Sequence, residues 1–244
     1  MAQARITWLG HSAFHLVSSE GKVALIDPFL KDNPSCPDRF KDPGQVDLIL
    51  LTHGHFDHVG NAAGLAKKFK CPVVGAVELC QLLGPELPED TACPMNIGGT
   101  QVIAGFTVTM TLALHSSSYQ VKGQPMYAGT PAGYVISATG SGAFYHTGDT
   151  DIFSDMSLIA ALHAPRIVAL PIGGHYTMGP RAAAMAIEML RPHCVIPMHY
   201  GTWPQLPGTA ADFRSELSLR GLQDVRILVM ARGDSHEWLL GECG

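Results

Sequence analysis

One short run of residues constrains this chain more than any other feature. Four residues that can bind a metal ion fall within six positions, directly after an apolar segment. They are His53, His55, Asp57 and His58, and the segment is Val46–Leu51. A continuous apolar run of this length predicts a strand buried on both faces. Polar side chains crowded at its end would be costly to desolvate unless something neutralises and orders them, and a divalent cation does both. Histidine nitrogen and aspartate oxygen suit zinc, and they also accept iron or manganese.

The sequence on both sides of this run predicts an alternation of short strands and helices. Strands are predicted at Arg5–Leu9, Ala13–Val17, Val23–Asp27, Pro72–Gly75, Thr100–Ile103, Phe106–Leu114, Gly133–Ser137, Ala143–Thr147, Ile167–Leu170, Val195–Pro197 and Val225–Val229. Helices are predicted at Asn61–Phe69, Glu78–Leu83 and Ala211–Leu219, and from Pro180 to a stop at Pro192. Loops are predicted at Pro28–Gly44, Pro85–Pro94 and Ser116–Pro131, the first and last of them at the mouth of a pocket. We find no repeat or linker, so one domain is predicted over residues 1–244.

Further residues that can bind a metal stand at the ends of these predicted strands. Asp27 closes one strand, His115 follows another, Asp149 lies in Thr147-Gly148-Asp149-Thr150, and His199 lies in Pro197-Met198-His199-Tyr200-Gly201. Each signal is weak alone, because a histidine at a strand end is more often structural and a Gly-Asp pair is usually a turn. Their order along the chain, together with the histidine run, is what makes them informative.

Taken together, these motifs resemble the metallo-β-lactamase superfamily over nearly the whole chain. The resemblance implies an α/β fold, a four-layer αβ/βα sandwich with the ligands at one edge. It also implies two divalent metal ions, zinc first and manganese or iron as alternatives. The first would take His53, His55 and His115, and the second Asp57, His58 and His199, with Asp149 bridging both. An aspartate rather than a cysteine at the bridging position indicates the broader hydrolase branch, not the β-lactamases.

Two further motifs narrow the resemblance. Gly10-His11-Ser12-Ala13-Phe14 and Gly173-Gly174-His175-Tyr176-Thr177-Met178-Gly179-Pro180 resemble a subgroup of small bacterial metal-dependent hydrolases. That subgroup is allied to ascorbate-6-phosphate lactonases and to N-acylphosphatidylethanolamine phospholipases. The resemblance therefore indicates the fold and the metal site more sharply than the substrate.

The implied site suggests a hydrolytic mechanism. Two adjacent metal ions acidify a bridging water, which can attack a carbonyl or phosphoryl centre of a small ester, lactone or phosphodiester. Asp57 is expected to orient the nucleophile as well as to bind a metal. His175 and His11 are candidate proton or hydrogen-bond donors to the substrate, although each can instead brace the metal ligands. Asp27 is expected to orient a ligand imidazole, and His146 to point away from the site.

Composition weighs against several other functions. The formal charge of −5 and the lack of a basic arm disfavour an RNA-cutting nuclease, which stays the enzymatic alternative. A two-iron redox role would require a flavin domain for which there is no room. A non-catalytic metal-binding protein is the other alternative, and the complete ligand set argues against it. The expected partner is a small-molecule substrate, without nucleic acid or membrane, and a homo-oligomer stays open.

The ends of the chain and its cysteines bear on location. Residues Met1–Arg5 run directly into a strand pattern, and no apolar stretch has the length of a membrane helix. The six cysteines are Cys36, Cys71, Cys80, Cys93, Cys194 and Cys243, and none forms a C-x-x-C pair. Reduced thiols in a cytoplasmic protein are expected from this pattern.

Overall fold

The computed structural model describes residues 4–238, which build two seven-stranded sheets. The first sheet has the order β16-β1-β2-β3-β4-β5-β6. Its strands are β1 (Arg5–Trp8), β2 (Phe14–Val17), β3 (Val23–Ile26), β4 (Leu48–Leu50), β5 (Val73–Ala76), β6 (Ala92–Met95) and β16 (Ser235–Glu237). Strands β1, β2 and β3 pair antiparallel, whereas β3 to β6 run parallel.

The second sheet has the order β15-β14-β13-β12-β11-β8-β7. Its strands are β7 (Thr100–Ile103), β8 (Phe106–Leu112), β11 (Ala132–Ala138), β12 (Phe144–His146), β13 (Ile167–Pro171), β14 (Cys194–Met198) and β15 (Arg226–Ile227). Strands β12 to β15 are parallel, while β7, β8, β11 and β12 form antiparallel pairs.

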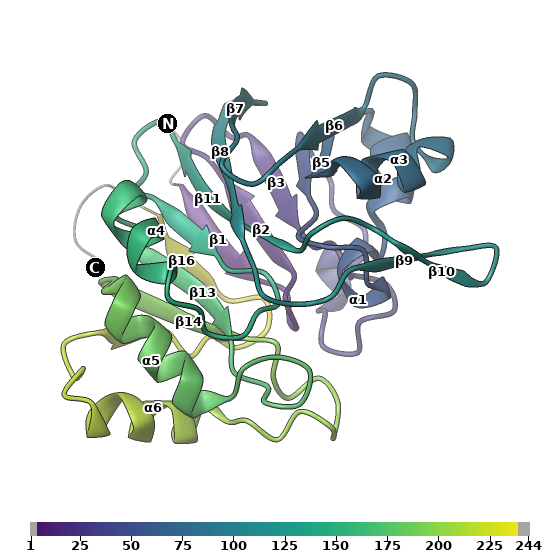
Figure 1. The fold of residues 1–244 in the computed structure, drawn as a ribbon. Coiled ribbons are helices and arrows are strands. Elements are labelled where there is room, and N and C mark those ends of the chain that lie inside the picture. The colour runs from purple at the N-terminus through teal and green to yellow at the C-terminus, as the bar shows by residue number, and fades with distance from the viewer. Residues whose placement is uncertain (1–3, 239–244) are drawn as a thin grey trace.

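Helices cover the outer face of each sheet, and Figure 1 shows the four layers that result. On one side lie α1 (Phe56–Val59), α2 (Ala62–Phe69) and α3 (Val77–Leu83), and on the other α4 (Met156–His163), α5 (Pro180–Leu190) and α6 (Ala210–Leu219). One apolar cluster joins the two sheets, including Phe14 from β2 and Val108 from β8. Two separate clusters fill the spaces between each sheet and its helices. The predicted αβ/βα sandwich is therefore confirmed.

Three predictions of local structure are wrong. The predicted loop Ser116–Pro131 contains a hairpin of β9 (Ser118–Val121) and β10 (Gln124–Tyr127), which projects from the body in Figure 1. Its turn is Lys122-Gly123, where both residues have positive φ, as a tight two-residue hairpin turn requires. The predicted loop Pro85–Pro94 ends in β6, and β16 had not been predicted at all. Both are edge strands, whose pairing depends on partners distant in sequence.

The cysteine prediction holds only in part. Cys36, Cys71, Cys80 and Cys93 are free thiols. The prediction is wrong for Cys194, which is disulfide-bonded; spacing in the sequence cannot reveal such a bond, because it depends on which residues the fold brings together. Residues Met1 to Gln3 and Cys243, on which other predictions rested, lie outside the described residues. Among residues 4–238, no helix combines the length and apolarity needed to cross a bilayer.

Candidate metal centre

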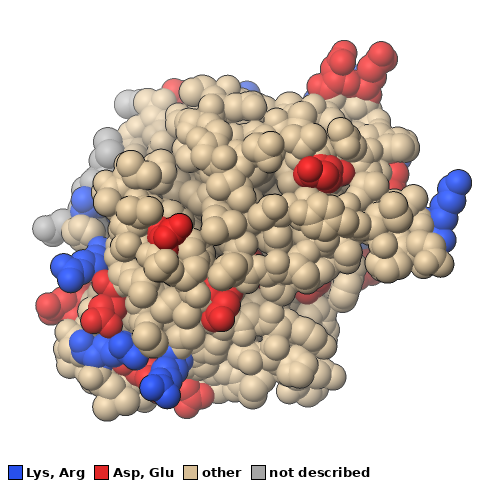
Figure 2. Space-filling model, viewed as in Figure 1, with Lys and Arg blue, Asp and Glu red and all other residues tan. Residues whose placement is uncertain are grey.

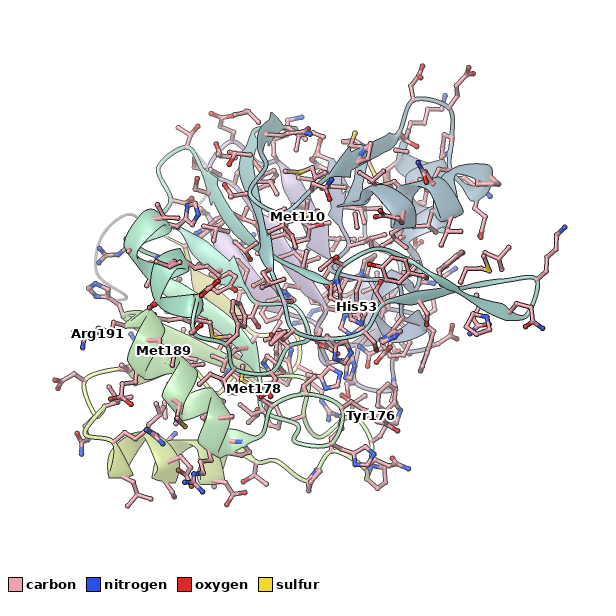
Figure 3. The ribbon with its side chains drawn as sticks, viewed as in Figure 1. His53, Met110, Tyr176, Met178, Met189 and Arg191 are labelled. Atoms are coloured by element: carbon pink, nitrogen blue, oxygen red, sulfur yellow. The ribbon has the colours of Figure 1, made fainter. Side chains whose placement is uncertain are left out.

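The seven predicted ligands follow the carboxyl ends of four strands. His53, His55, Asp57 and His58 follow β4, His115 follows β8, Asp149 follows β12, and His199 follows β14. Strands of both sheets end at the same edge of the sandwich, where Figure 3 labels His53. Because these strands are buried and hydrogen-bonded, the backbone that carries the ligands is fixed by the two sheets.

The first three predicted ligands come together. His53, His55 and His115 each offer a ring nitrogen, and these atoms lie within 4.8 Å of one another. Nδ1 of His53 lies 3.0 Å from the Thr52 hydroxyl, so its Nε2 faces the cluster, 2.9 Å from Nδ1 of His55. Gly54 is required between the two: a Cβ there would lie 2.8 Å from the Ala128 side chain.

The second predicted set also comes together, and the structure adds one residue to it. Asp57, His58, His199 and His11 offer atoms within 4.8 Å of one another. Oδ2 of Asp57 lies 3.9 Å from Nε2 of His58, 4.0 Å from Nε2 of His199 and 3.0 Å from Nε2 of His11. The other ring nitrogen of His11 is 2.9 Å from the hydroxyl of Thr202.

Asp149 lies between the two groups. Its Oδ2 is 2.9 Å from Nε2 of His199, 3.2 Å from Nε2 of His58 and 3.8 Å from Nε2 of His115. It also forms a ligating set with His53 and His58. The hydroxyl of Ser12 donates to the other oxygen, Oδ1, at 3.3 Å, which orients the carboxylate. A single buried oxygen is therefore within reach of ligands from both groups.

These residues fit a metal ion. Two ligands bound at about 2.0–2.1 Å to one tetrahedral ion lie about 3.4 Å apart, close to the separations around Asp149. Nε2 of His58 is buried and has no hydrogen-bond partner, although Asp149 Oδ2 is 3.2 Å away. The two atoms are near each other without the direction of a hydrogen bond, as expected for two ligands that aim at a common point. All the donors are imidazole or carboxylate groups, which suit divalent zinc, manganese or iron.

Asp27 supports the ligands from behind. Its Oδ2 lies 2.7 Å from Nδ1 of His58 and accepts a hydrogen bond from the Thr52 hydroxyl at 2.7 Å, while Oδ1 accepts from the Thr52 amide at 2.8 Å. Asp27 thus contacts the ring of one predicted ligand, His58, as its expected orienting role requires. A carboxylate behind a ligating histidine fixes the ring and raises its basicity.

The pKa values at the site are shifted because carboxylates are buried among imidazoles. Burial lowers the pKa of His53 well below its usual value, and the neighbouring His58 adds to that effect. Burial also acts to lower the pKa of His58, but Asp149, Asp27 and Asp57 outweigh it and hold that pKa well above its usual value. Burial acts to raise the pKa of Asp149, yet His199 and His58 bring that pKa well below its usual value. The carboxylate at the centre of the site is therefore ionised, the form that binds cations.

Several backbones at the site are strained. His11, Asp27 and His199 have φ values of 55°, 45° and 54°, in the left-handed region that residues other than glycine rarely adopt. The amide of His199 donates to the carbonyl of His11 at 3.0 Å, which ties two of these residues together. Unfavourable conformations of this kind persist where surrounding structure holds functional side chains in place.

The structure separates the two histidines proposed to act on substrate. His11 is fully buried against Asp57 and Thr202, and burial lowers its pKa to about 4. This position favours the bracing role over direct contact with substrate. His175 is exposed and its ring packs against Tyr176, which Figure 3 labels on a loop apart from His53. No described hydrogen bond or ion pair links His175 to the ligands, so its role in catalysis stays a prediction.

Some supporting residues were not identified from the sequence. His146 is fully buried; its Nε2 lies 3.0 Å from the carbonyl of Ser12, and its Nδ1 accepts from the amide of Gly148 at 3.1 Å. It therefore fixes the turn that carries Asp149, although its ring does not join the ligands. Trp203 packs edge-on to His11 at 4.7 Å between ring centroids. Neither residue lies in a motif, and both act through contacts with distant segments.

The hydroxyl of Ser117 joins two segments beside the site. The hydroxyl of Ser117 accepts from the amide of Gly54 at 3.2 Å and donates to the carbonyl of Ala128 at 3.3 Å. It thus connects the histidine run to the end of the β9–β10 hairpin. Nothing in these contacts makes Ser117 a nucleophile.

Known proteins resemble this chain in sequence and in fold. A family model described as the β-lactamase superfamily domain matches residues 5–199. The chain is 48% identical over 217 residues to a UPF0173 metal-dependent hydrolase of Myxococcus xanthus, a match that covers 88% of this chain and 77% of the relative. It is similar to the solved structure of Igni18, a metallo hydrolase of Ignicoccus hospitalis, with a TM-score of 0.82 and 33% identity over 96% of this chain and 97% of that one. YhfI of Bacillus subtilis, a metallo-β-lactamase fold protein, gives a TM-score of 0.71 at 14% identity over 97% of this chain and 100% of that one, which shows the fold alone.

Proposed function

The chain belongs to the β-lactamase superfamily and to its UPF0173 metal-dependent hydrolases, and on that basis we propose that it holds two zinc ions and cleaves a small ester, lactone or phosphodiester. When bound, two such ions would lower the pKa of a bound water toward neutrality and so supply a hydroxide nucleophile. The expected partner is a small molecule rather than nucleic acid, since the formal charge is −5.

One observation carries the proposal of two metals rather than one. Oδ2 of Asp149 lies 2.9 Å from His199 in one group and 3.8 Å from His115 in the other. An oxygen placed between two sets of three ligands supports a shared, bridging carboxylate. With a single metal, one of these sets would be a close cluster of metal-binding side chains that holds no ion.

The chain's own residues have separate tasks in this proposal. His53, His55 and His115 hold one ion, and His58 and His199 hold the other. Asp57 is half-buried, so it is accessible from the side where substrate enters, and it binds the second ion and orients the nucleophile. His11 holds Asp57 through its contact at 3.0 Å and thereby limits the positions of that carboxylate.

The test combines metal analysis with an activity screen. Purified protein is stripped with a chelator, reloaded with zinc, manganese or iron, and assayed on lactones, esters, phosphodiesters and amides. We expect two ions per chain and hydrolysis in at least one class with the reloaded protein alone. Asp57→Ala is expected to lose turnover by far more than it loses stability, because Asp57 is at the surface of the site rather than in the core.

Two outcomes would contradict the proposal. One ion per chain at full activity would remove the bridging role of Asp149. Equal, slow hydrolysis of every substrate by wild type and Asp57→Ala would mean that the site is not catalytic.

A further inference from the structure

Three aromatic side chains form a continuous surface beside the second ligand group. The rings of Phe29 and Phe56 are 6.1 Å apart between centroids and nearly perpendicular, and the ring of Trp203 lies 6.2 Å from each of them. Trp203 and Phe29 also contact His11, at 4.7 and 6.0 Å. Because His11 contacts Asp57 directly, this aromatic surface borders the half of the site that Asp57 serves.

The surface is exposed at one end and buried at the other. Phe29 is only 3% exposed, Trp203 is half-buried, and Phe56 is 70% exposed. Phe56 stands at the start of α1 between two ligands, His55 and Asp57, which are themselves half-buried. An aromatic ring that faces water here is therefore next to the point where the ligands are accessible.

Hydrogen bonds hold the aromatic surface in place. The side-chain oxygen of Asn61 accepts from the backbone amides of Leu30 and Lys31 at 3.0 and 2.8 Å, and the backbone amide of Asn61 donates to the carbonyl of Pro28 at 2.9 Å. These bonds fix the segment that carries Phe29 to the residue that follows α1. A preformed apolar surface loses little conformational entropy when a ligand covers it.

The surroundings favour an uncharged ligand group. Leu30 is followed directly by two charged residues, Lys31 and Asp32, which are exposed and of opposite sign. In the view of Figure 2, Lys and Arg gather at the lower left and at the tip of the β9–β10 hairpin, and the middle is mostly uncharged with a few separate Asp and Glu. Lys and Arg are the side chains that usually pair with a phosphate group, and no described side-chain contact of the predicted ligands or of the three aromatic rings includes either of them.

We propose that Phe29, Phe56 and Trp203 form an apolar subsite that binds an alkyl or aryl group of the substrate beside the metal centre. This rests on the proposed hydrolase function and deepens it. The substrate class is then carboxylic esters or lactones that carry such a group, in preference to phosphodiesters. Aromatic faces both contact the apolar group and displace water from the side of Asp57.

The test measures binding without turnover. Zinc-loaded protein is titrated calorimetrically with straight-chain carboxylates of two, six and ten carbons, which are products of ester cleavage. We expect wild type to bind the longer acids more tightly, by about twofold to fourfold per methylene while the chain lies on the aromatic surface. Phe56→Ala should lose most of the gain in affinity with chain length; zinc content is measured alongside, since Phe56 adjoins ligands.

Two further variants complete the design. Trp203→Ala should reduce the chain-length effect in the same way, which guards against a local disturbance of α1. Leu162→Ala is the matched control, because Leu162 is 77% exposed on α4 and makes no described contact with the site. It should retain the wild-type dependence on chain length.

The outcomes separate this proposal from the proposed function. Affinity that does not change with chain length in wild type, or that changes equally in Phe56→Ala, would overturn the subsite. Chain-length-dependent binding through Phe56 without hydrolysis of any ester, lactone or phosphodiester would leave the subsite and reject the function. Ester hydrolysis with the same kcat/KM at every chain length would support the proposed function and reject the subsite.

Discussion

The carboxylate of Asp27 lies 2.7 Å from Nδ1 of His58, and both side chains are fully buried. The same carboxylate accepts two hydrogen bonds from Thr52, the residue before the histidine run. One acid therefore sets the orientation of a ligand ring and the start of the segment that carries four ligands. Both oxygens of Asp27 are engaged in these contacts, Oδ1 with the Thr52 amide and Oδ2 with the Thr52 hydroxyl and His58.

Asp27→Asn should weaken metal binding while leaving all seven ligands in the chain. The asparagine side chain has one acceptor oxygen, whereas the carboxylate has two. Its NH₂ group would therefore face a group that Asp27 now accepts from. That group is the backbone amide of Thr52 in one orientation, and the Thr52 hydroxyl with His58 in the other. Loss of such a supporting contact typically lowers metal affinity by about 10–100-fold. Competition with a chelating dye measures the change.

Asp47→Asn is the matched control for this substitution. Asp47 accepts from the amide of Val23 at 2.8 Å, at the opposite ends of β3 and β4 from the site. Its replacement should leave metal affinity unaltered. Equal losses in the two variants would show that Asp27 acts on general stability rather than on the metal ligands.

Buried thiols should make stability fall at alkaline pH. Burial raises the pKa of Cys36, Cys71 and Cys80 from 9.0 to about 11. Above pH 9 an unfolded chain ionises these thiols while the folded chain keeps them protonated. The folded state then binds more protons, so the free energy of unfolding decreases as pH rises from about 9 to 11.

Cys80→Ala isolates this effect from other groups that titrate in the same range. Cys80 lies on α3 and is buried, with its Sγ 3.6 Å from the carbonyl oxygen of Gly75 in β5, and its removal should destabilise the protein at pH 7 through lost packing. The difference in unfolding free energy between wild type and variant should shrink from pH 9 to pH 11, by at most about 1.4 kcal/mol per pH unit. Urea unfolding at several pH values measures it, and a constant difference would contradict the prediction.

The histidine run could be identified from the sequence as a metal-binding candidate because its signal is local: residues such as His53 and Asp57 lie within a few positions of each other. His115 and His199 were weak signals at the ends of apolar runs, and only the resemblance to a known family assigned them to the same site. The helix Pro180–Leu190 was equally clear, since a proline begins it and its apolar spacing is regular.

What could not be predicted depends on contacts between distant segments. His11 contacts Asp57 across 46 positions of the chain, and Trp203 reaches His11 from beyond β14. No motif indicates whether a histidine near a metal faces substrate or a carboxylate. The aromatic surface was missed for the same reason, because Phe29 stood in a predicted loop and Phe56 inside the metal-binding run.

Gly173→Ala should remove His199 from its working position. A Cβ on Gly173 would lie 2.3 Å from the carbonyl oxygen of His199 and 3.3 Å from its Nδ1, so the backbone after β14 must shift. Crowding of this kind typically costs about 1–3 kcal/mol of stability. Because His199 belongs to the second ligand group only, we expect bound zinc to fall toward one ion per chain, as measured by elemental analysis, with a lower Tm. Gly64→Ala is the control: nothing lies within 4 Å of its added Cβ on α2, and a helical alanine should leave metal content unchanged and stabilise by about 0.5–1 kcal/mol. Two ions per chain in Gly173→Ala would show that His199 is not held by this close approach.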